Sequence, residues 1–171
     1  MNMKFNTLFN LVLASVILLS GVSCLDINDD RRTYTAAEEQ AFLQMYLDSL
    51  VADDYDIDTT ANGVYYVVLD TGEGDFAKEG DTLTVGYAGY FIDGNLFDSS
   101  DKLKDKKMEF ILGEDSMIRG WEEGMTVINK GARVQLIIPS ELAYGSTGDF
   151  YIIPPYQTLV FVIKMIDIKP S

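Results

Sequence analysis

Acidic residues provide the first pattern with chemical meaning, because Asp54, Asp56 and Asp58 occupy alternate positions. This is the spacing of the first, third and fifth ligands of a calcium-binding loop. The rest of the pattern fails: Thr59 stands where the sharp turn needs glycine, and Tyr65 stands where the ion needs a bidentate glutamate. We therefore expect a solvated acidic linker here and no calcium site.

The chain contains no histidine and a single cysteine among its 171 residues. Catalytic Ser-His-Asp and Cys-His pairs need an imidazole base, and most zinc sites need clusters of histidine or cysteine. Neither arrangement can be built from this sequence, and an intramolecular disulfide is impossible. Most hydrolase mechanisms and most zinc chemistry are therefore excluded.

The formal net charge is −14, and Lys4 is the one charged residue before Cys24, so the remainder carries about −15. The lysines at 102, 104, 106 and 107 are interrupted by Asp105 and form no basic patch. Nucleic acid is bound by clustered Lys and Arg that displace counterions, so the sequence predicts no nucleic-acid partner. Because 47% of the residues are apolar, the chain can bury one ordinary core.

Residues 1–24 have the layout of a secretory signal: one positive charge, an apolar run from Leu8 to Leu19, and small residues before Cys24. The run is too short to span a membrane comfortably. The end of this segment resembles a bacterial lipobox, in which the cysteine is acylated, although Gly21 stands where leucine is usual. We expect a lipid anchor at Cys24 and a cell-envelope location, on the periplasmic or surface face of the outer membrane. An ordinary cleaved signal or an uncleaved anchor is the alternative.

Residues 25–63 are expected to form an acidic linker that contains one helix over about 35–51. Thr35 followed three residues later by Glu38 predicts a capping box at its start. An apolar stripe follows at helical spacing, which packs either onto the main domain or onto a partner. The stripe consists of Phe42, Met45, Tyr46 and Leu50.

Residues 64–171 alternate between apolar and polar side chains, as strands do. Ile118, Trp121 and Met125 instead follow helical spacing, and Lys130-Gly131 ends that segment. The order predicts an α+β fold in which an antiparallel sheet of about five strands curls over one short helix. The predicted strands are Val64–Leu69, Thr82–Phe91, Met108–Leu112, Ala132–Ile138 and Thr158–Ile168.

Five motifs in this region, in register over about residues 60–170, resemble the FKBP-type peptidyl-prolyl cis-trans isomerase family. They are Tyr87-Ala-Gly-Tyr-Phe-Ile-Asp-Gly-Asn-Leu-Phe97-Asp98-Ser-Ser, Phe110-Ile-Leu-Gly113 with Ile118-Arg-Gly-Trp121-Glu-Glu-Gly124, Ile138-Pro139, Leu142-Ala-Tyr144-Gly145, and Ile152-Ile153-Pro154-Pro155. The resemblance implies a half-open sheet around a short helix, with an aromatic pocket for a proline ring between them. Periodicity alone would favour ordinary core positions for the aromatic residues.

The resemblance also implies a role for each pocket residue. Trp121 would form the floor, with Tyr87, Phe97 and Phe161 as walls. Ile118 would supply a backbone N–H, Tyr144 a hydroxyl, and Asp98 a carboxylate at the rim. Substrate contacts are expected from Met108, Met117, Ile152 and Ile153.

Three features depart from the family pattern. Met108 stands where an aromatic wall residue is common, and its flexible thioether is expected to broaden binding. Asp149 replaces a frequent loop histidine and is expected to disfavour acidic residues near the substrate proline. One extra residue before Met108 leaves either Lys102 or Lys104 as the basic partner of Asp98.

The expected function is isomerisation of X-Pro bonds in exported, unfolded polypeptides, without a cofactor and with macrolide-type inhibitors as possible ligands. Bond rotation needs no acid, base or metal, so the absence of histidine is compatible with it. One alternative is a binding or chaperone module that holds chains without turnover. Another is a surface lipoprotein that meets a partner through residues 25–63.

Overall fold

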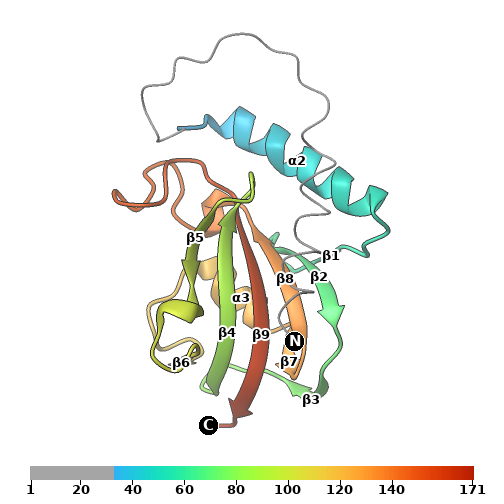
Figure 1. Cartoon of the computed structure of the whole chain (residues 1–171), viewed down its shortest axis with the longest axis vertical. Helices are drawn as coiled ribbons and strands as arrows, with labels where there is room; N and C mark the ends of the chain where they lie inside the picture. The colour runs from blue at the N-terminus through green and yellow to red at the C-terminus, as the bar shows by residue number, and fades with distance from the viewer. Residues whose placement is uncertain (1–32) are drawn as a thin grey trace.

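The computed structural model describes residues 33–171, so the predicted signal segment, Cys24 and the first part of the linker lie outside the described residues. The described part contains one long helix, one short helix and a strongly curved antiparallel sheet (Figure 1). None of its helices is both long and apolar enough to cross a membrane.

The main sheet has seven antiparallel strands in the order β1-β2-β8-β9-β4-β5, and β6 pairs with β4 beside β5. The predicted α+β fold is confirmed, and all five predicted strands are present. The sheet is larger than predicted because it includes two short edge strands, β1 and β5. These were not predicted because their sequences show little hydrophobic alternation. Its strands are β1 (Asp58–Thr59), β2 (Tyr65–Asp70), β4 (Thr82–Phe91), β5 (Leu96–Ser99), β6 (Met108–Ile111), β8 (Arg133–Ile138) and β9 (Leu159–Lys169); β3 (Glu73–Phe76) and β7 (Asn129–Lys130) form a separate pair.

Successive residues of β8 and β9 point to opposite faces of the sheet, as the period of a strand requires. Leu136 and Phe161 face the core beneath α3, whereas their sequence neighbours Ile137 and Val160 face the other side. Because both faces carry apolar side chains, each face needs a covering element. The two helices provide this cover.

Helix α3 (Arg119–Met125) covers the inner face of the sheet and buries Trp121 and Met125. The helix lies unusually close to β8 because glycine faces it. A Cβ atom on Gly120 would be 2.3 Å from Cγ2 of Ile138, and one on Gly124 would be 2.2 Å from Cδ1 of Leu136. A larger residue at either position would therefore require Ile138 or Leu136 to move, or the helix to shift away from the sheet.

Helix α2 (Ala36–Ala52) packs on the outer face and crosses one end of the sheet (Figure 1). The predicted capping box is confirmed, since the Thr35 hydroxyl accepts from the Glu38 N–H and the Glu38 carboxylate accepts from the Thr35 N–H. Of the predicted apolar stripe, Tyr46 and Leu50 are buried against β2, β8 and β9.

The other half of that stripe does not pack on the main domain, which was one of the two expected alternatives. Met45 is 54% exposed and Phe42 is 37% exposed, and the Phe42 ring contacts Tyr34 at a centroid distance of 5.1 Å. The buried face of α2 is completed instead by Leu43 and Leu47. It is also fixed by a hydrogen bond of 3.0 Å from Gln135 Nε2 to the Tyr46 hydroxyl.

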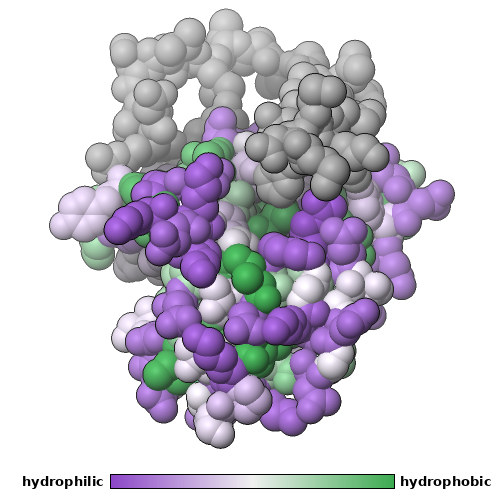
Figure 2. Space-filling model, turned by 60° about the horizontal axis from the view of Figure 1, so that its bottom comes forward, coloured by the Kyte–Doolittle hydropathy of each residue, from purple (hydrophilic) through white to green (hydrophobic). Residues whose placement is uncertain are grey.

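One face of the molecule shows how hydrophilic and hydrophobic residues are distributed on its surface. The face in Figure 2 is mostly hydrophilic, with hydrophobic residues in small separate patches. Hydrophilic side chains therefore dominate this side of the molecule.

Candidate active site: an aromatic cage between helix and sheet

Four aromatic side chains from four different elements converge between α3 and the sheet. Trp121 of α3 meets Phe161 of β9 at a ring-centroid distance of 5.0 Å and Tyr87 of β4 at 5.3 Å, both edge to face. Phe97 of β5 meets Phe161 at 5.6 Å, also edge to face. These are favourable ring geometries. We call these four residues the aromatic cage, and all were predicted site residues.

The cage depends on the absence of a side chain at Gly89. A Cβ atom there would lie 2.7 Å from Cε1 of Phe161 and 2.8 Å from Cζ of Phe97. The two rings therefore rest directly on the backbone of β4. The sequence interpretation missed this residue; a glycine inside an otherwise apolar strand was the available signal.

Asp98 is held at the rim by three donors. The Tyr87 hydroxyl donates to Oδ2 at 2.9 Å, the Ser99 N–H donates to Oδ1 at 2.7 Å, and Lys102 Nζ lies 2.5 Å from Oδ1. Of the two lysines left open by the sequence, Lys102 is thus the basic partner. Burial raises the pKa of Asp98, but the bonds from Lys102, Tyr87 and Ser99 outweigh it and lower the pKa below its ordinary value.

Tyr87 is fixed at both its backbone and its hydroxyl. Its N–H donates to Ser100 Oγ at 3.0 Å, and that hydroxyl donates back to the Tyr87 carbonyl at 3.3 Å. Burial, followed by the bond to the ionised Asp98, raises the pKa of Tyr87 well above its ordinary value. The phenol therefore stays neutral and presents its ring, not its proton, to the cage. Ser100 is a second residue that the sequence interpretation did not assign to the site.

Two donors at the rim have no acceptor among residues 33–171. Ile118 precedes α3 with extended backbone angles, and its N–H enters no hydrogen bond within the described chain. The Tyr144 hydroxyl likewise has no partner there, and its side chain is 39% exposed. Burial, and then the charges of Asp149 and Asp98, raise the pKa of Tyr144, so its hydroxyl remains a donor at neutral pH.

The loop that follows Tyr144 is organised by Asp149. Its Oδ1 accepts from the N–H groups of Tyr151, Ile152 and Ile153 at 2.9, 2.7 and 2.7 Å. Burial raises the pKa of Asp149, but the three N–H groups lower it below its ordinary value overall. The carboxylate is thus ionised and turned toward its own loop, and its charge still acts on Tyr144 at the rim.

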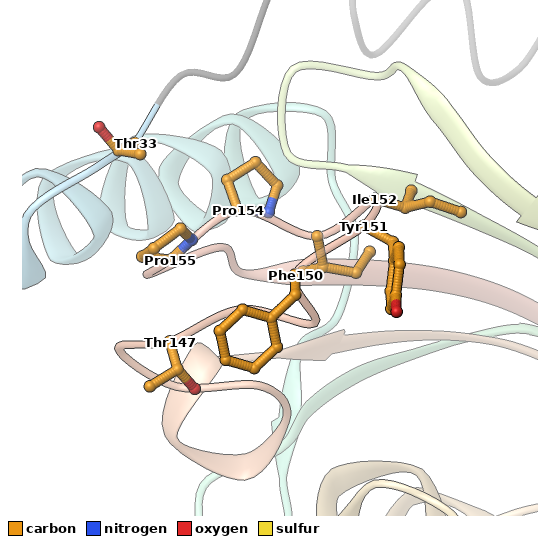
Figure 3. A pocket seen from close by; sticks show the side chains of 8 residues that line it. Thr33, Thr147, Phe150, Tyr151, Ile152, Pro154 and Pro155 are labelled. Carbon is orange, nitrogen blue, oxygen red and sulfur yellow. The ribbon is translucent and has the colours of Figure 1, made fainter.

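The loop tip is apolar and exposed (Figure 3). Phe150 is 79% exposed and Tyr151 is 85% exposed, and both help to line a cavity of about 210 Å³. Ile152 is also exposed, but Ile153 is buried in the core cluster that includes Trp121. Of this predicted pair, Ile152 thus lies on the surface, whereas Ile153 lies in the core beside the cage.

Met108 and Met117 are half-buried against the same core cluster. Phe110, two residues after Met108, brings its ring to 6.2 Å from that of Trp121. The structure thus gathers the four cage residues with Ile118 and the two methionines around one core. It places Asp98 and Tyr144 at the rim of this core.

Comparisons with known proteins agree with this geometry. A family model described as "FKBP-type peptidyl-prolyl cis-trans isomerase" matches residues 73–166. FkpA of Escherichia coli K12, an FKBP-type peptidyl-prolyl cis-trans isomerase, is 39% identical over 136 residues, which are 80% of this chain and 48% of FkpA. A probable FKBP-type isomerase of Haemophilus influenzae is 39% identical over 116 residues, 68% of this chain and 47% of that protein. The chain thus spans about half the length of the curated relatives it matches.

Solved structures give the same result. The crystal structure of Escherichia coli FkpA superposes with a TM-score of 0.61 at 31% identity, covering 99% of this chain and 84% of FkpA. An isomerase structure from Pseudomonas syringae gives a TM-score of 0.65 at 29% identity, covering 83% of this chain and 99% of that one. The chain belongs to the FKBP-type peptidyl-prolyl cis-trans isomerase family.

Proposed function

We propose that this protein is an active peptidyl-prolyl cis-trans isomerase that acts on proline-containing segments of exported polypeptides. The observation that carries the proposal is the aromatic cage, together with two unengaged donors beside it, the Ile118 N–H and the Tyr144 hydroxyl. A proline ring fits an apolar aromatic cage, and the carbonyl before it can accept from such donors.

The reaction requires rotation about a bond and no bond cleavage. An X-Pro amide interconverts in tens to hundreds of seconds because rotation breaks amide resonance, with a barrier of about 20 kcal/mol. A turnover of about 10 to 1,000 per second would require the barrier to fall by roughly 3–7 kcal/mol. This reduction is modest, so a site without acid, base or metal is sufficient.

The residues of the site supply two contributions. The planar amide is more polar than the twisted one, so the apolar cage around Trp121 disfavours the planar ground state. Donors that bind the twisted carbonyl more tightly add to this effect, and the Ile118 N–H and the Tyr144 hydroxyl are placed to do so. Asp98 keeps the Tyr87 ring in position, and Ile152 and the methionines contact residues that flank the proline.

A protease-coupled assay on short X-Pro peptides tests the proposal. Trp121→Leu and Asp98→Ala should each lower kcat/KM strongly, because the first removes the floor of the cage and the second releases Tyr87. The proposal fails if the purified wild type gives no rate above the uncatalysed one. If the wild type is active, macrolide-type inhibitors, which would occupy the same cage, should compete with the peptide.

A non-catalytic holding function is the second candidate, favoured by the exposed side chains of Phe150 and Tyr151. Such a surface suits capture of unfolded chains without turnover. Suppression of aggregation by the wild type, together with no isomerase rate, would select this function.

The proposed location is the cell envelope, with a lipid anchor at Cys24 that holds the protein on the periplasmic or surface face of the outer membrane. The support is the signal-like pattern of residues 1–24. Palmitate labelling of the wild type but not of Cys24→Ala is expected. Labelling that survives this substitution would exclude the anchor.

A further inference from the structure

Glu39 of α2 reaches across to the segment that carries Tyr144. Its Oε1 accepts from the Ser140 N–H at 2.7 Å and from the Thr158 hydroxyl at 2.8 Å, and its Oε2 accepts from the Ser140 hydroxyl at 2.6 Å. One carboxylate thus joins both ends of the loop between β8 and β9. We call this set of bonds the Glu39 clamp.

The groups that Glu39 satisfies are buried: Ser140 is 4% exposed and Thr158 is 2% exposed. Ser140 begins the short helix η2 (Ser140–Leu142), and the residue before it, Pro139, provides no side-chain cap. A buried N–H without a partner is costly, and a carboxylate is a strong acceptor for it. Glu39 therefore takes the place of a local cap, although it is about a hundred residues away in sequence.

From Ser140 the clamp continues to Tyr144. The Ser140 carbonyl accepts from the N–H of Ala143 at 2.9 Å and from the N–H of Gly145 at 2.8 Å, the two residues that flank Tyr144. Arg119 Nη2 donates to the next carbonyl, that of Glu141, at 2.6 Å. The backbone around Tyr144 is thus held from α2 on one side and from α3 on the other.

The second branch of the clamp leads toward the cage. Thr158 directly precedes β9, and Phe161 lies three residues further along the chain. Glu39 therefore contacts the chain just before one cage wall and just before the rim hydroxyl. The helix that carries Glu39 is itself anchored independently, by Tyr46 and Leu50 on the sheet.

We infer that Glu39 is a positioning residue for the isomerase site, so that α2 is part of the catalytic unit and not a spacer. The inference rests on the proposed function and deepens it. Glu39 acts through Ser140 and Thr158 and touches no substrate. It lies outside residues 73–166, the range that the family model covers.

The test compares Glu39→Ala and Glu39→Gln with Asp48→Asn in the full chain. Asp48 is a matched control, because it is an exposed acid on the same helix whose contact is with Gln44, also on α2. Hydrogen exchange of the Ala143 and Gly145 amides reports on the clamp without any need for catalysis. Isomerase kcat and KM report on how the clamp affects catalysis. Both are measured in each variant with and without Tyr144→Phe.

In Glu39→Ala, the two amides should exchange at least about 10-fold faster while amides of β4 keep their protection. The value of kcat/KM should fall by about 10-fold, mainly through kcat, because a small displacement of a positioned group lowers the reaction rate strongly. Tyr144→Phe should then cost much less in this background than in the wild type. Glu39→Gln keeps the side-chain shape and one acceptor, so its amide exchange and kcat/KM should lie between those of Glu39→Ala and the wild type. Asp48→Asn should match the wild type in both.

Unchanged exchange at the two amides would overturn the inference. Faster exchange at these amides would also overturn it if kcat/KM stayed unchanged and Tyr144→Phe lowered activity in Glu39→Ala as much as in the wild type. A uniform rise in exchange at every amide, in Glu39→Gln as well, would show that Glu39 only stabilises the fold as a whole. This result would also overturn the inference. If the wild type does not catalyse, the proposed function fails separately, and peptide affinity measured by fluorescence of Trp121, the single tryptophan, replaces kcat/KM.

Discussion

The backbone of Gly89 is in direct contact with the ring of Phe161: a Cβ atom on Gly89 would lie 2.7 Å from Cε1 of that ring. Gly89→Ala must therefore displace Phe161 or Phe97. We expect a loss of about 1–3 kcal/mol in the free energy of unfolding, as overpacking usually costs. We also expect a clear rise in KM, because the cage narrows. Urea unfolding and the peptide assay measure the two effects.

Gly86→Ala is the matched control on the same strand. There the nearest atom to a new Cβ would be Cδ1 of Ile166 at 3.8 Å, an ordinary contact. Because alanine loses less backbone entropy than glycine on folding, stability should be unchanged or slightly higher. Equal effects of the two substitutions would contradict the assigned role of Gly89.

Tyr144→Phe should separate catalysis from stability. Its hydroxyl has no partner among residues 33–171, so its removal should leave the free energy of unfolding unchanged. If the hydroxyl binds the twisted carbonyl, kcat should fall by about 3- to 10-fold, which corresponds to one hydrogen bond of about 1 kcal/mol. A reduced stability with an unchanged kcat would assign the hydroxyl to the fold instead.

Lys102→Gln should raise the pKa of Asp98 toward its ordinary value, since Lys102 is the strongest of the groups that lower it. Lys104→Gln is the control, because Lys104 forms no ion pair in the part of the chain that the structure describes. Titration of the carboxyl carbon of Asp98 by NMR measures the shift in each variant. An equal shift in both variants would show that Lys102 has no special role.

The low pKa of Asp98 also predicts how stability depends on pH. Because the pKa of Asp98 is depressed in the folded state, its ionised form stabilises the fold above the unfolded value, about 3.9. This stabilisation is lost as the pH falls through the folded value. The difference in unfolding free energy between wild type and Asp98→Asn should therefore be constant at neutral pH and shrink below about pH 4. A difference that grows toward acid would contradict the assignment.

Much of the fold was predictable because its signals are local. Alternation of apolar and polar residues predicted the strand that became β9, whose Leu159, Phe161, Ile163 and Met165 all lie in the core cluster. The capping box at Thr35 predicted where α2 begins. The cage was not predictable in this way, because its four rings come from separate elements and each alone resembles an ordinary core residue; the motif series identified them.

The remaining errors concern contacts that join distant parts of the chain. Nothing near Glu39 in the sequence indicates that it binds Ser140 and Thr158. Phe42 and Met45 fit the helical period, but their neighbours Leu43 and Tyr46 are the ones that face the sheet, so Phe42 and Met45 remain exposed. The bonds from Asp149 to its own loop were also not anticipated, and its effect on acidic substrate residues stays a prediction.

The most direct test of the central claim is two-dimensional exchange NMR on a short X-Pro peptide with a small amount of the purified protein. This method observes the rotation itself and needs no coupled protease. We predict exchange cross-peaks between cis and trans forms at a mixing time of tens of milliseconds, and their loss with Trp121→Leu. Exchange that stays at the uncatalysed rate, while the peptide still changes the fluorescence of Trp121, would show a binding site that does not catalyse.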